Sequence, residues 1–250
     1  MHRDLALAHE LADLADSITL ARFRDADLAV ETKPDLTPVS EADTAVERAV
    51  RERLGRERPD EPVFGEEEGG EAAAPVRWIL DPIDGTKSYV RGVPVFATLI
   101  ALERDGEAVV GLASAPALGR RWWAVRGEGA FADGEPIRVS RVARLEDALV
   151  AYTSARAFRE RGLGFDAVVD RAWAARGFPD FWQHVLVAEG AVDAACEAAV
   201  ALWDVAAIQV IVEEAGGRFT DLRGRRTPAG GDCLTSNGRL HDEVLALLGA

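Results

Sequence analysis

The start of the chain alternates apolar and polar positions with the period of a surface helix. Residues 4–24 place leucines and an isoleucine at helical spacing, with acids and arginines between them, which predicts an amphipathic helix. Residues 32–39 contain two prolines and are expected to form a loop. Ser40 stands where it can cap a second helix over residues 41–54, whose first turn is acidic.

From residue 63 to residue 139 the pattern changes to short apolar runs separated by turn residues. Such sequential strands predict an antiparallel sheet packed on the first two helices. Residues 69–75 are expected to form a flexible surface loop, and Arg104-Asp105-Gly106 a hairpin turn. The expected strands are 63–65, 78–81, 95–102, 108–115, 121–126 and 137–139.

Beyond residue 140 strands and helices alternate. We therefore expect an N-terminal portion, residues 1–140, with the helices and the antiparallel sheet, and a C-terminal α/β portion, residues 141–250, that completes the active site. The expected strands of this portion are 148–153, 180–182, 193–197, 219–222 and 233–236, and its expected helices are 157–175, 184–190, 203–215 and 241–248.

The most informative stretch follows the apolar run Trp-Ile-Leu and contains Asp81 and Asp84. Pro82 cannot donate to a strand ladder, so we expect the chain to turn directly after Asp81. Gly85 allows a ligand to approach the backbone closely, and Thr86 places a hydroxyl beside it. Two fixed acids beside exposed N–H groups suit a hard cation and a phosphate. The structural alternative is an ordinary polar turn after a strand.

Composition narrows the classes of function. The formal net charge of −14 argues against a nucleic-acid partner, which requires a basic surface. It leaves anionic substrates open, because bound cations can reverse the sign of a local site. No apolar run is long enough for a membrane span, and no signal-peptide core is visible. Two cysteines, Cys196 and Cys233, favour neither a disulfide framework nor a zinc site, and indicate the reducing cytoplasm.

Lysine is rare in this chain. Lys33 and Lys87 are its two lysines, and the other basic residues are arginines. Lys87 lies in the stretch from Asp81 to Lys87, here called the central motif. A lysine there is notable, because an ammonium and a guanidinium are not interchangeable at a tight site.

Five acids are candidates for one site, although each has a structural explanation when taken alone. Asp43 can be a first-turn acid of the second helix, Glu66 part of a solvated charge run, and Asp204 a helix cap. Asp81 and Asp84 can belong to a polar turn. Their order along the chain, each beside a strand end or a helix start, favours a common function.

The motifs together resemble the signatures of the inositol monophosphatase superfamily over essentially the whole chain. The matching segments are Ser40-Glu41-Ala42-Asp43, Gly65-Glu66-Glu67, Asp81-Pro82-Ile83-Asp84-Gly85-Thr86, Trp203-Asp204-Val205-Ala206-Ala207, Glu213-Glu214-Ala215-Gly216-Gly217 and Thr235-Ser236-Asn237. The resemblance implies a layered αβαβα sandwich, with α+β and α/β portions, that is usually a homodimer. It also implies hydrolysis of small phosphate monoesters with magnesium.

The resemblance also implies a ligand set for the metals. Glu66, Asp81 and the backbone carbonyl of Ile83 would hold a first Mg²⁺. Asp81, Asp84 and Asp204 would hold a second, and the site would contain roughly two or three ions. Oxygen donors alone select magnesium over zinc.

By the same resemblance, a metal-activated water attacks in line without a covalent intermediate. Thr86, linked to Asp43, would orient and deprotonate that water, and Glu66 would assist through another water. The backbone N–H groups of Gly85 and Thr86 would hold the phosphate.

The substrate is indicated by the residues after the metal motif. Lys87-Ser88-Tyr89 and the continuation to residue 102 look most like the histidinol-phosphate phosphatase branch, where inositol phosphatases tend to have Thr-Asn-Phe. Pro179-Asp180-Phe181-Trp182 supports this branch, although Pro179 stands where the branch has Gly.

Histidinol phosphate carries an amine and an imidazole, so its pocket should offer acids and aromatic faces. Asp180, Trp182 and Glu197 are the expected substrate contacts, with Asp204 also beside the substrate. A turn acid and a core aromatic are the structural alternatives for Asp180 and Trp182. Lys87 could contact the loop or the substrate. The alternative functions are an inositol monophosphatase, a 3′-phosphoadenosine 5′-phosphate phosphatase, and an inactive binding scaffold.

Overall fold

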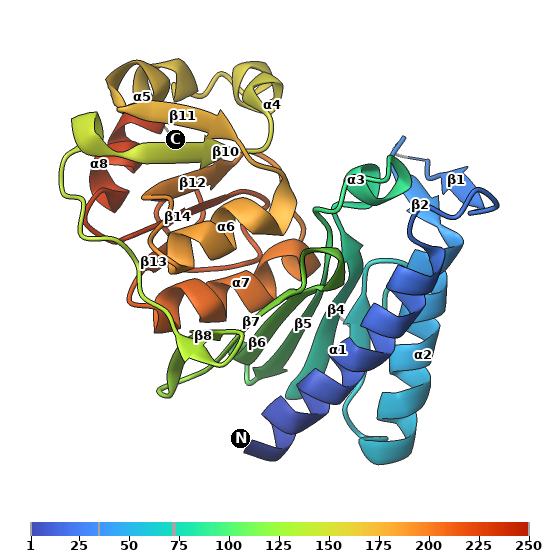
Figure 1. Cartoon of the computed structure of the whole chain (residues 1–250). Coiled ribbons are helices and arrows are strands. Elements are labelled where there is room, and N and C mark those ends of the chain that lie inside the picture. The colour runs from blue at the N-terminus through green and yellow to red at the C-terminus, as the bar shows by residue number, and fades with distance from the viewer. Residues whose placement is uncertain (1, 35, 72–73, 250) are drawn as a thin grey trace.

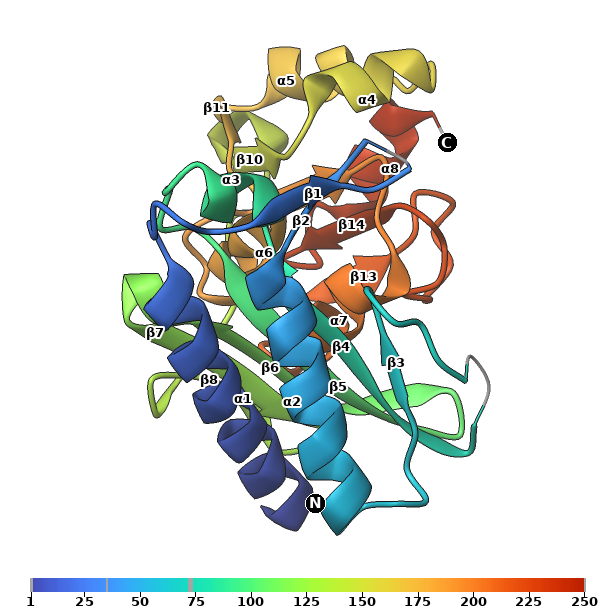
Figure 2. The ribbon, with the colours of Figure 1, turned by 90° about the vertical axis from the view of Figure 1, so that its right-hand side faces the viewer.

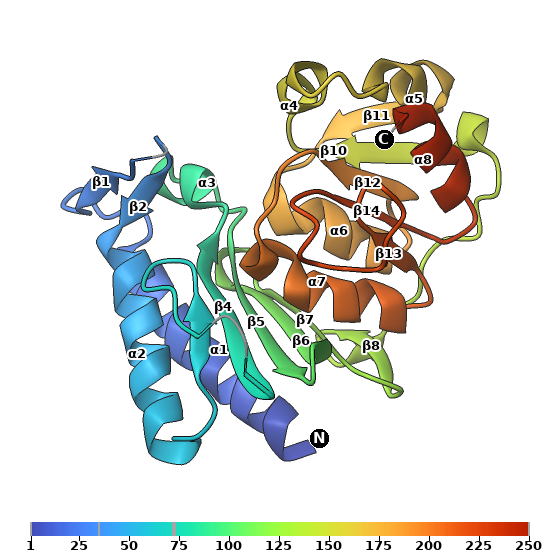
Figure 3. The same ribbon diagram turned by 180° about the vertical axis from the view of Figure 1, so that it is seen from behind.

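The computed structural model describes residues 2–34, 36–71 and 74–249 as five alternating layers (Figure 1). Helices α1 (His2–Arg22) and α2 (Glu41–Glu57) lie side by side on the outer face of a first sheet, as Figure 2 shows. Helices α6 (Asp180–Ala188) and α7 (Leu202–Glu214) lie between this sheet and a second one (Figure 3). Helices α4 (Ala155–Glu160), α5 (Phe165–Arg171) and α8 (His241–Leu248) cover the far face. This is the predicted αβαβα sandwich.

The first sheet has seven strands in the order β3-β4-β5-β6-β7-β8-β9. All neighbours are antiparallel except β3 and β4, which are parallel. The bounds are β3 Val63–Gly65, β4 Val76–Asp84, β5 Ala97–Arg104, β6 Glu107–Ala115, β7 Arg120–Val125, β8 Gly129–Ala132 and β9 Glu135–Pro136. The expected strand at 137–139 is wrong, because the N–H of Val139 donates to the carbonyl of Ala215 at the end of α7 rather than to the sheet.

The second sheet has five strands in the order β11-β10-β12-β14-β13. Strand β10 is parallel to β11 and β12, whereas β14 is antiparallel to both of its neighbours. The bounds are β10 Leu149–Tyr152, β11 Ala174–Gly177, β12 Ala194–Glu197, β13 Arg218–Thr220 and β14 Cys233–Ser236.

Two expectations in this half are wrong. The single helix expected over 157–175 is divided into α4, α5 and the start of β11, because Gly162 adopts a positive φ and the close packing of Gly164 on Leu247 leaves no room for a side chain. Residues 180–182, expected as a strand, form the first turn of α6, which begins directly after Pro179.

The segment between α1 and α2 also differs from its expectation. Instead of an irregular loop over 32–39, β1 (Val30–Thr32) and β2 (Pro38–Ser40) form an antiparallel pair, here called the β1–β2 hairpin. Pro38 is tolerated because it is the first residue of β2, which is an edge strand. In the expected loop 69–75, residues 72–73 lie outside the described residues, and Gly69 forms a bridge to Gly65.

Helix α7 joins the two halves of the chain in one core. It packs on β6 so closely that a Cβ added at Gly111 would lie 2.3 Å from the carbonyl oxygen of Ala207. Its apolar side chains share a core cluster with α6 and the first sheet. The division into residues 1–140 and 141–250 stays a prediction. Short helices α3 (Thr86–Val90), η1 (Pro116–Leu118) and η2 (Leu145–Asp147) complete the structure. No helix in the described ranges is long and apolar enough to cross a bilayer.

Candidate active site

Strand β4 ends in the central motif, and it does so later than expected. It passes through Pro82 and continues to Asp84, with a shift of register against β5 between Asp81 and Asp84. The expected turn directly after Asp81 is therefore wrong. Pairing with β3 ends at Leu80, and the irregular register on the β5 side accommodates a residue without an N–H group.

This local geometry fixes two of the acids. The N–H of Ile83 donates to Oδ1 of Asp81 at 3.0 Å, so the side chain of Asp81 is held beside its own strand. Asp84 Oδ2 accepts a 2.6 Å hydrogen bond from the N–H of Phe181, which belongs to the first turn of α6. One acid is thus oriented by β4 itself, and the other ties the first sheet to the C-terminal half.

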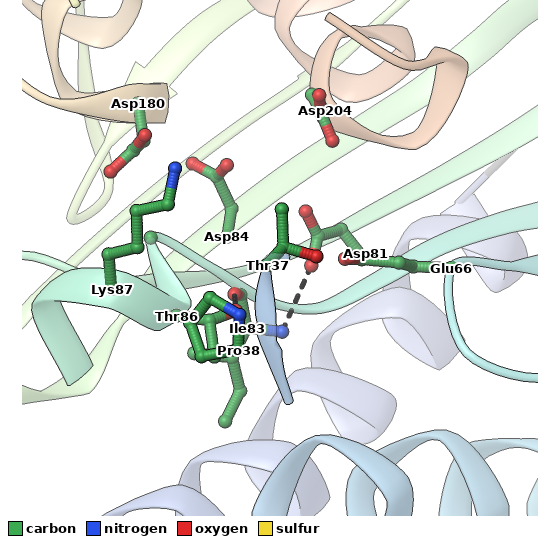
Figure 4. Close-up of a pocket in the computed structure, with 11 residues that line it drawn as sticks. Thr37, Pro38, Glu66, Asp81, Ile83, Asp84, Thr86, Lys87, Asp180 and Asp204 are labelled. Carbon is green, nitrogen blue, oxygen red and sulfur yellow. Dashed lines mark hydrogen bonds between the residues drawn. The ribbon is translucent and has the colours of Figure 1, made fainter. Parts of the chain in front are cut away.

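The third acid comes from the start of α7. Asp204 reaches back so that its Oδ2 accepts a 2.8 Å hydrogen bond from the N–H of Ala201, as an acid in a first helical turn can do. Asp204 is therefore the third residue of α7 and not its cap, which is Ala201, and its role as a metal ligand stays a prediction. Carboxylate oxygens of Asp81, Asp84 and Asp204 lie within 4.8 Å of one another. Figure 4 shows the three side chains directed toward a shared space.

This carboxylate cluster is electrostatically unfavourable without a cation. Burial raises the pKa of Asp81 well above its usual range, and the charges of Glu66 and Asp84 raise it further. Burial and the charge of Asp180 likewise raise the pKa of Asp84. Burial raises the pKa of Asp204 to about 7, against the hydrogen bond from Ala201. Buried oxygen donors that repel one another fit a hard divalent cation.

Glu66 lines the same pocket but does not belong to this group of three. Its Oε1 accepts a 2.8 Å hydrogen bond from Nζ of Lys33 on the β1–β2 hairpin, and Glu67 Oε1 accepts another at 2.7 Å. Sequence reasoning missed Lys33 as a site residue. The available signal was the rarity of lysine in the chain, but only the hairpin brings Lys33 to the acids.

Thr86 lies between two acceptors. Its Oγ1 is 2.9 Å from the carbonyl oxygen of Ile83 and 3.3 Å from Oδ1 of Asp43. The other carboxylate oxygen of Asp43 accepts hydrogen bonds from the N–H and the hydroxyl of Ser40, at 2.8 and 2.6 Å. Burial raises the pKa of Asp43, and the Ser40 hydrogen bonds oppose that shift. The predicted link between Thr86 and Asp43 is thus present.

Gly85 precedes α3 with a φ of +84°. A Cβ at this position would lie 3.1 Å from both Asp180 Oδ2 and the carbonyl oxygen of Val95. Glycine is therefore required both by its conformation and by the close approach of α6.

Two adjoining pockets meet at these residues. The first, of about 170 Å³, we call the metal pocket, and the second, of about 320 Å³, the leaving-group pocket. They share Asp84, Lys87, Asp180 and Asp204, and Figure 4 shows Lys87 extending from α3 toward Asp180 and Asp84. The metal pocket is lined by Thr37, Pro38, Glu66, Asp81, Ile83, Asp84, Gly85, Thr86, Lys87, Asp180 and Asp204.

The predicted substrate contacts divide into two groups. Asp180 and Glu197 both line the leaving-group pocket. Burial and the charge of Glu197 raise the pKa of Asp180 to about 6, whereas Lys87 lowers it. Trp182 is not brought to either pocket. It packs against Phe178, with ring centroids 5.3 Å apart, and against the central core cluster, which is the structural alternative stated above.

Comparisons with known proteins show the family of the chain. The model of the inositol monophosphatase family matches residues 1–249. The chain is 53% identical to a histidinol-phosphatase of Streptomyces coelicolor, with 98% of this chain and 96% of that protein covered. It is 52% identical to a histidinol-phosphatase of Mycobacterium tuberculosis, with 100% and 99% covered.

Solved structures give the same result for the fold. An inositol monophosphatase of Zymomonas mobilis matches with a TM-score of 0.89 at 34% identity, covering 100% of this chain and 98% of that one. An inositol monophosphatase of Thermotoga maritima matches with a TM-score of 0.89 at 31% identity, covering 100% and 97%. The family match spans nearly the whole chain. The chain belongs to the inositol monophosphatase family.

Proposed function

We propose that this chain is a histidinol-phosphatase, which hydrolyses L-histidinol phosphate to L-histidinol and phosphate in histidine biosynthesis. The observation that carries the proposal is the junction of a carboxylate cluster with a second, acidic pocket that contains Asp180 and Glu197. A leaving alcohol with an ammonium group gains a charge attraction to these two acids, whereas a neutral polyol can offer them only hydroxyl hydrogen bonds. The identity of 52–53% to two histidinol-phosphatases over almost the full chain supports the same substrate.

The metal in this proposal is Mg²⁺, at roughly two or three ions per site. Asp81, Asp84 and Asp204 would hold one ion, and Glu66 with Asp81 and the carbonyl oxygen of Ile83 another. When bound, Mg²⁺ neutralises phosphate charge and makes water more acidic.

Thr86 and Asp43 would orient the water and accept its proton. A threonine hydroxyl has one hydrogen to donate, and in this structure two acceptors lie within reach of it. When the carbonyl oxygen of Ile83 is engaged as a ligand, Asp43 Oδ1 is the remaining acceptor. Oγ1 of Thr86 then presents its lone pairs to the water. The N–H groups of Gly85 and Thr86, at the start of α3, would donate to the phosphate.

Hydrolysis then breaks the bond between phosphorus and the ester oxygen. The water oxygen attacks phosphorus in line after giving up a proton to Thr86 and Asp43, and the departing alkoxide takes up a proton from the solvent to leave as the alcohol. Asp180, Glu197 and Asp204 would contact the alcohol, with Asp180 and Glu197 beside its ammonium group. Trp182 stays a prediction as a further contact.

A comparison of substrates tests the proposal. Phosphate release is measured with Mg²⁺ for L-histidinol phosphate, inositol 1-phosphate and 3′-phosphoadenosine 5′-phosphate, each with an EDTA-treated control. We expect the highest kcat/KM with L-histidinol phosphate and no release after EDTA treatment. Equal or faster turnover of either other ester would reject the assignment, and no release from any ester would favour an inactive scaffold. In cells, the chain should rescue a histidinol-phosphatase-deficient strain on minimal medium, whereas its Asp84→Asn variant should not.

We also propose that the protein is a cytoplasmic homodimer. The family resemblance supports the dimer, and the two buried free cysteines, Cys196 and Cys233, are compatible with a reducing compartment. Light scattering coupled to size-exclusion chromatography should give twice the mass of the chain, and cell fractionation should recover it with cytoplasmic enzymes.

A further inference from the structure

A buried histidine stands directly behind the leaving-group pocket. The side chain of His184 in α6 is 1% exposed, and its Nε2 lies 2.9 Å from Oε1 of Glu197, whose side chain is 11% exposed. Its Nδ1 lies 2.7 Å from Oγ1 of Thr235 on β14, and Cys233 Sγ lies 3.8 Å from Nε2. The imidazole thus bridges two neighbouring strands of the second sheet from the helix that covers them.

Each ring nitrogen of His184 has a hydrogen-bond partner. An ionised carboxylate only accepts, so Nε2 of His184 donates to Glu197. Nδ1 of His184 lies 2.7 Å from the hydroxyl of Thr235, which also donates to the carbonyl oxygen of Ala195 at 3.4 Å. Contacts at both ring nitrogens fix the plane of the imidazole, and with it the position of one oxygen of Glu197.

Glu66 and Glu197 are held by different kinds of side chain. Glu66 is paired with the ammonium of Lys33, which offsets its charge. Glu197 is instead oriented by the imidazole of His184, and it lines the leaving-group pocket. Asp180 lies one helical turn before His184 in α6 and lines the same pocket, so a single helix supplies one acid and orients the other.

We propose that His184, held by Thr235, is a positioning residue that orients Glu197 toward the cationic group of the leaving alcohol. The inference rests on the proposed function, because it assigns His184 to recognition of an ammonium-bearing ester. It predicts that loss of His184 weakens the preference for esters of cationic alcohols over esters of neutral ones. The effect should appear mainly in KM, and the chemical step should be little affected.

The test measures kcat/KM for L-histidinol phosphate and for p-nitrophenyl phosphate, whose leaving group carries no cation. His184→Phe should lower the ratio of kcat/KM for L-histidinol phosphate to kcat/KM for p-nitrophenyl phosphate about tenfold. Most of this loss should come from a higher KM for L-histidinol phosphate. His184→Gln, whose amide N–H can donate to Glu197, should recover most of the ratio. Glu197→Gln should lower the ratio at least as far, and adding His184→Phe to it should lower it no further, because the two residues act as one unit.

His241 provides the matched control. It is equally buried and its ring nitrogens also contact two hydroxyls, those of Thr220 and Ser236, but it does not line either pocket. His241→Phe should leave the ratio unchanged even where it lowers the melting temperature. If His184→Phe does not fold, Thr235→Val should lower the ratio in the same direction by about threefold.

The outcomes separate the two claims. A wild-type protein that does not hydrolyse L-histidinol phosphate overturns the proposed function and this inference with it. A wild-type protein that hydrolyses it, with a ratio that His184→Phe and Thr235→Val leave unchanged, overturns this inference alone. Equal loss with both esters would assign His184 a purely structural role.

Discussion

Lys33 and Glu66 form an ion pair at the edge of the metal pocket, with Nζ of Lys33 2.8 Å from Oε1 of Glu66. The pair is partly buried, and Lys33 also contacts Glu67, so the β1–β2 hairpin places a positive charge against two acids. Their hydrogen bonds and charges raise the pKa of Lys33, against the effect of burial. Lys33 therefore stays charged and competes for an oxygen that we propose as a metal ligand.

Lys33→Met should tighten metal activation. Removing one positive charge near a divalent ion lowers the repulsion by roughly 1 kcal/mol, so the Mg²⁺ concentration for half-maximal activity should fall about fivefold. Mg²⁺ titrations of steady-state phosphate release measure this. Lys33→Arg, which keeps the charge, is the control and should stay near wild type. A higher Mg²⁺ requirement in Lys33→Met would show that Lys33 supports Glu66 rather than competing for it.

Local patterns predicted most of the fold. Asp81, Asp84 and Gly85 lie in one short segment, so they could be recognised together, and the periodicity of residues 4–24 and 203–215 identified α1 and α7. The layered sandwich followed from the resemblance to the family. The errors concentrate where tertiary pairing overrides local preference. Pro82 predicted a turn, but pairing with β5 continues β4 to Asp84.

The parts that sequence reasoning missed are contacts between distant segments. Lys33 is 33 residues from Glu66, and Phe181 is 97 residues from Asp84, so no local pattern reports these hydrogen bonds. His184 belongs to none of the motifs, yet it contacts the predicted substrate residue Glu197, which is 13 residues away in sequence. In each case the partners meet because helices and sheets pack against one another. Such packing leaves no regular interval along the sequence from which the contact could be predicted.

The metal-free protein should lose stability as pH rises. The folded pKa of Asp204 is about 7 against an ordinary value of 3.8, so between about pH 4 and about pH 7 the folded state binds more protons than the unfolded state. The free energy of unfolding therefore decreases with rising pH in this window, by about 1.4 kcal/mol for each unit of pKa shift.

Asp204→Asn should flatten that dependence. In EDTA, urea unfolding at about pH 5 and about pH 7.5 should give a smaller difference for the variant than for wild type, and greater stability than wild type at the higher pH. Glu52→Gln, at an exposed position of α2, is the control and should keep the wild-type slope. With Mg²⁺, the variant should lose activity. A variant as pH-dependent as wild type would contradict this account of the cluster.

Thr86→Ala should lower kcat with little change in KM. If Oγ1 of Thr86 orients the water and takes its proton, its loss removes a general-base contribution of about 100-fold or more, while metal and phosphate ligands stay in place. Steady-state kinetics give kcat and KM, and calorimetry of Mg²⁺ binding checks the metal site. Thr86→Ser keeps the hydroxyl and should retain most activity. Wild-type kcat in Thr86→Ala would exclude this role.

Gly111→Ala should reduce stability and activity together, because it acts on the position of α7. A Cβ on β6 at this site would lie 2.3 Å from the carbonyl oxygen of Ala207 and 3.0 Å from Cβ of Val210, so the helix must move away from the sheet. Overpacking of this kind costs about 1–3 kcal/mol. The same displacement moves Asp204, in the first turn of α7, relative to Asp81 and Asp84 on β4. Urea unfolding and Mg²⁺ titration measure the two effects.

Gly55→Ala in α2, where a Cβ meets no atom within 4 Å, should instead stabilise the protein by about 1 kcal/mol and leave the Mg²⁺ requirement unchanged. If Gly111→Ala destabilised the fold but kept the wild-type Mg²⁺ requirement, the packing of α7 on β6 would not be what holds Asp204 in the cluster.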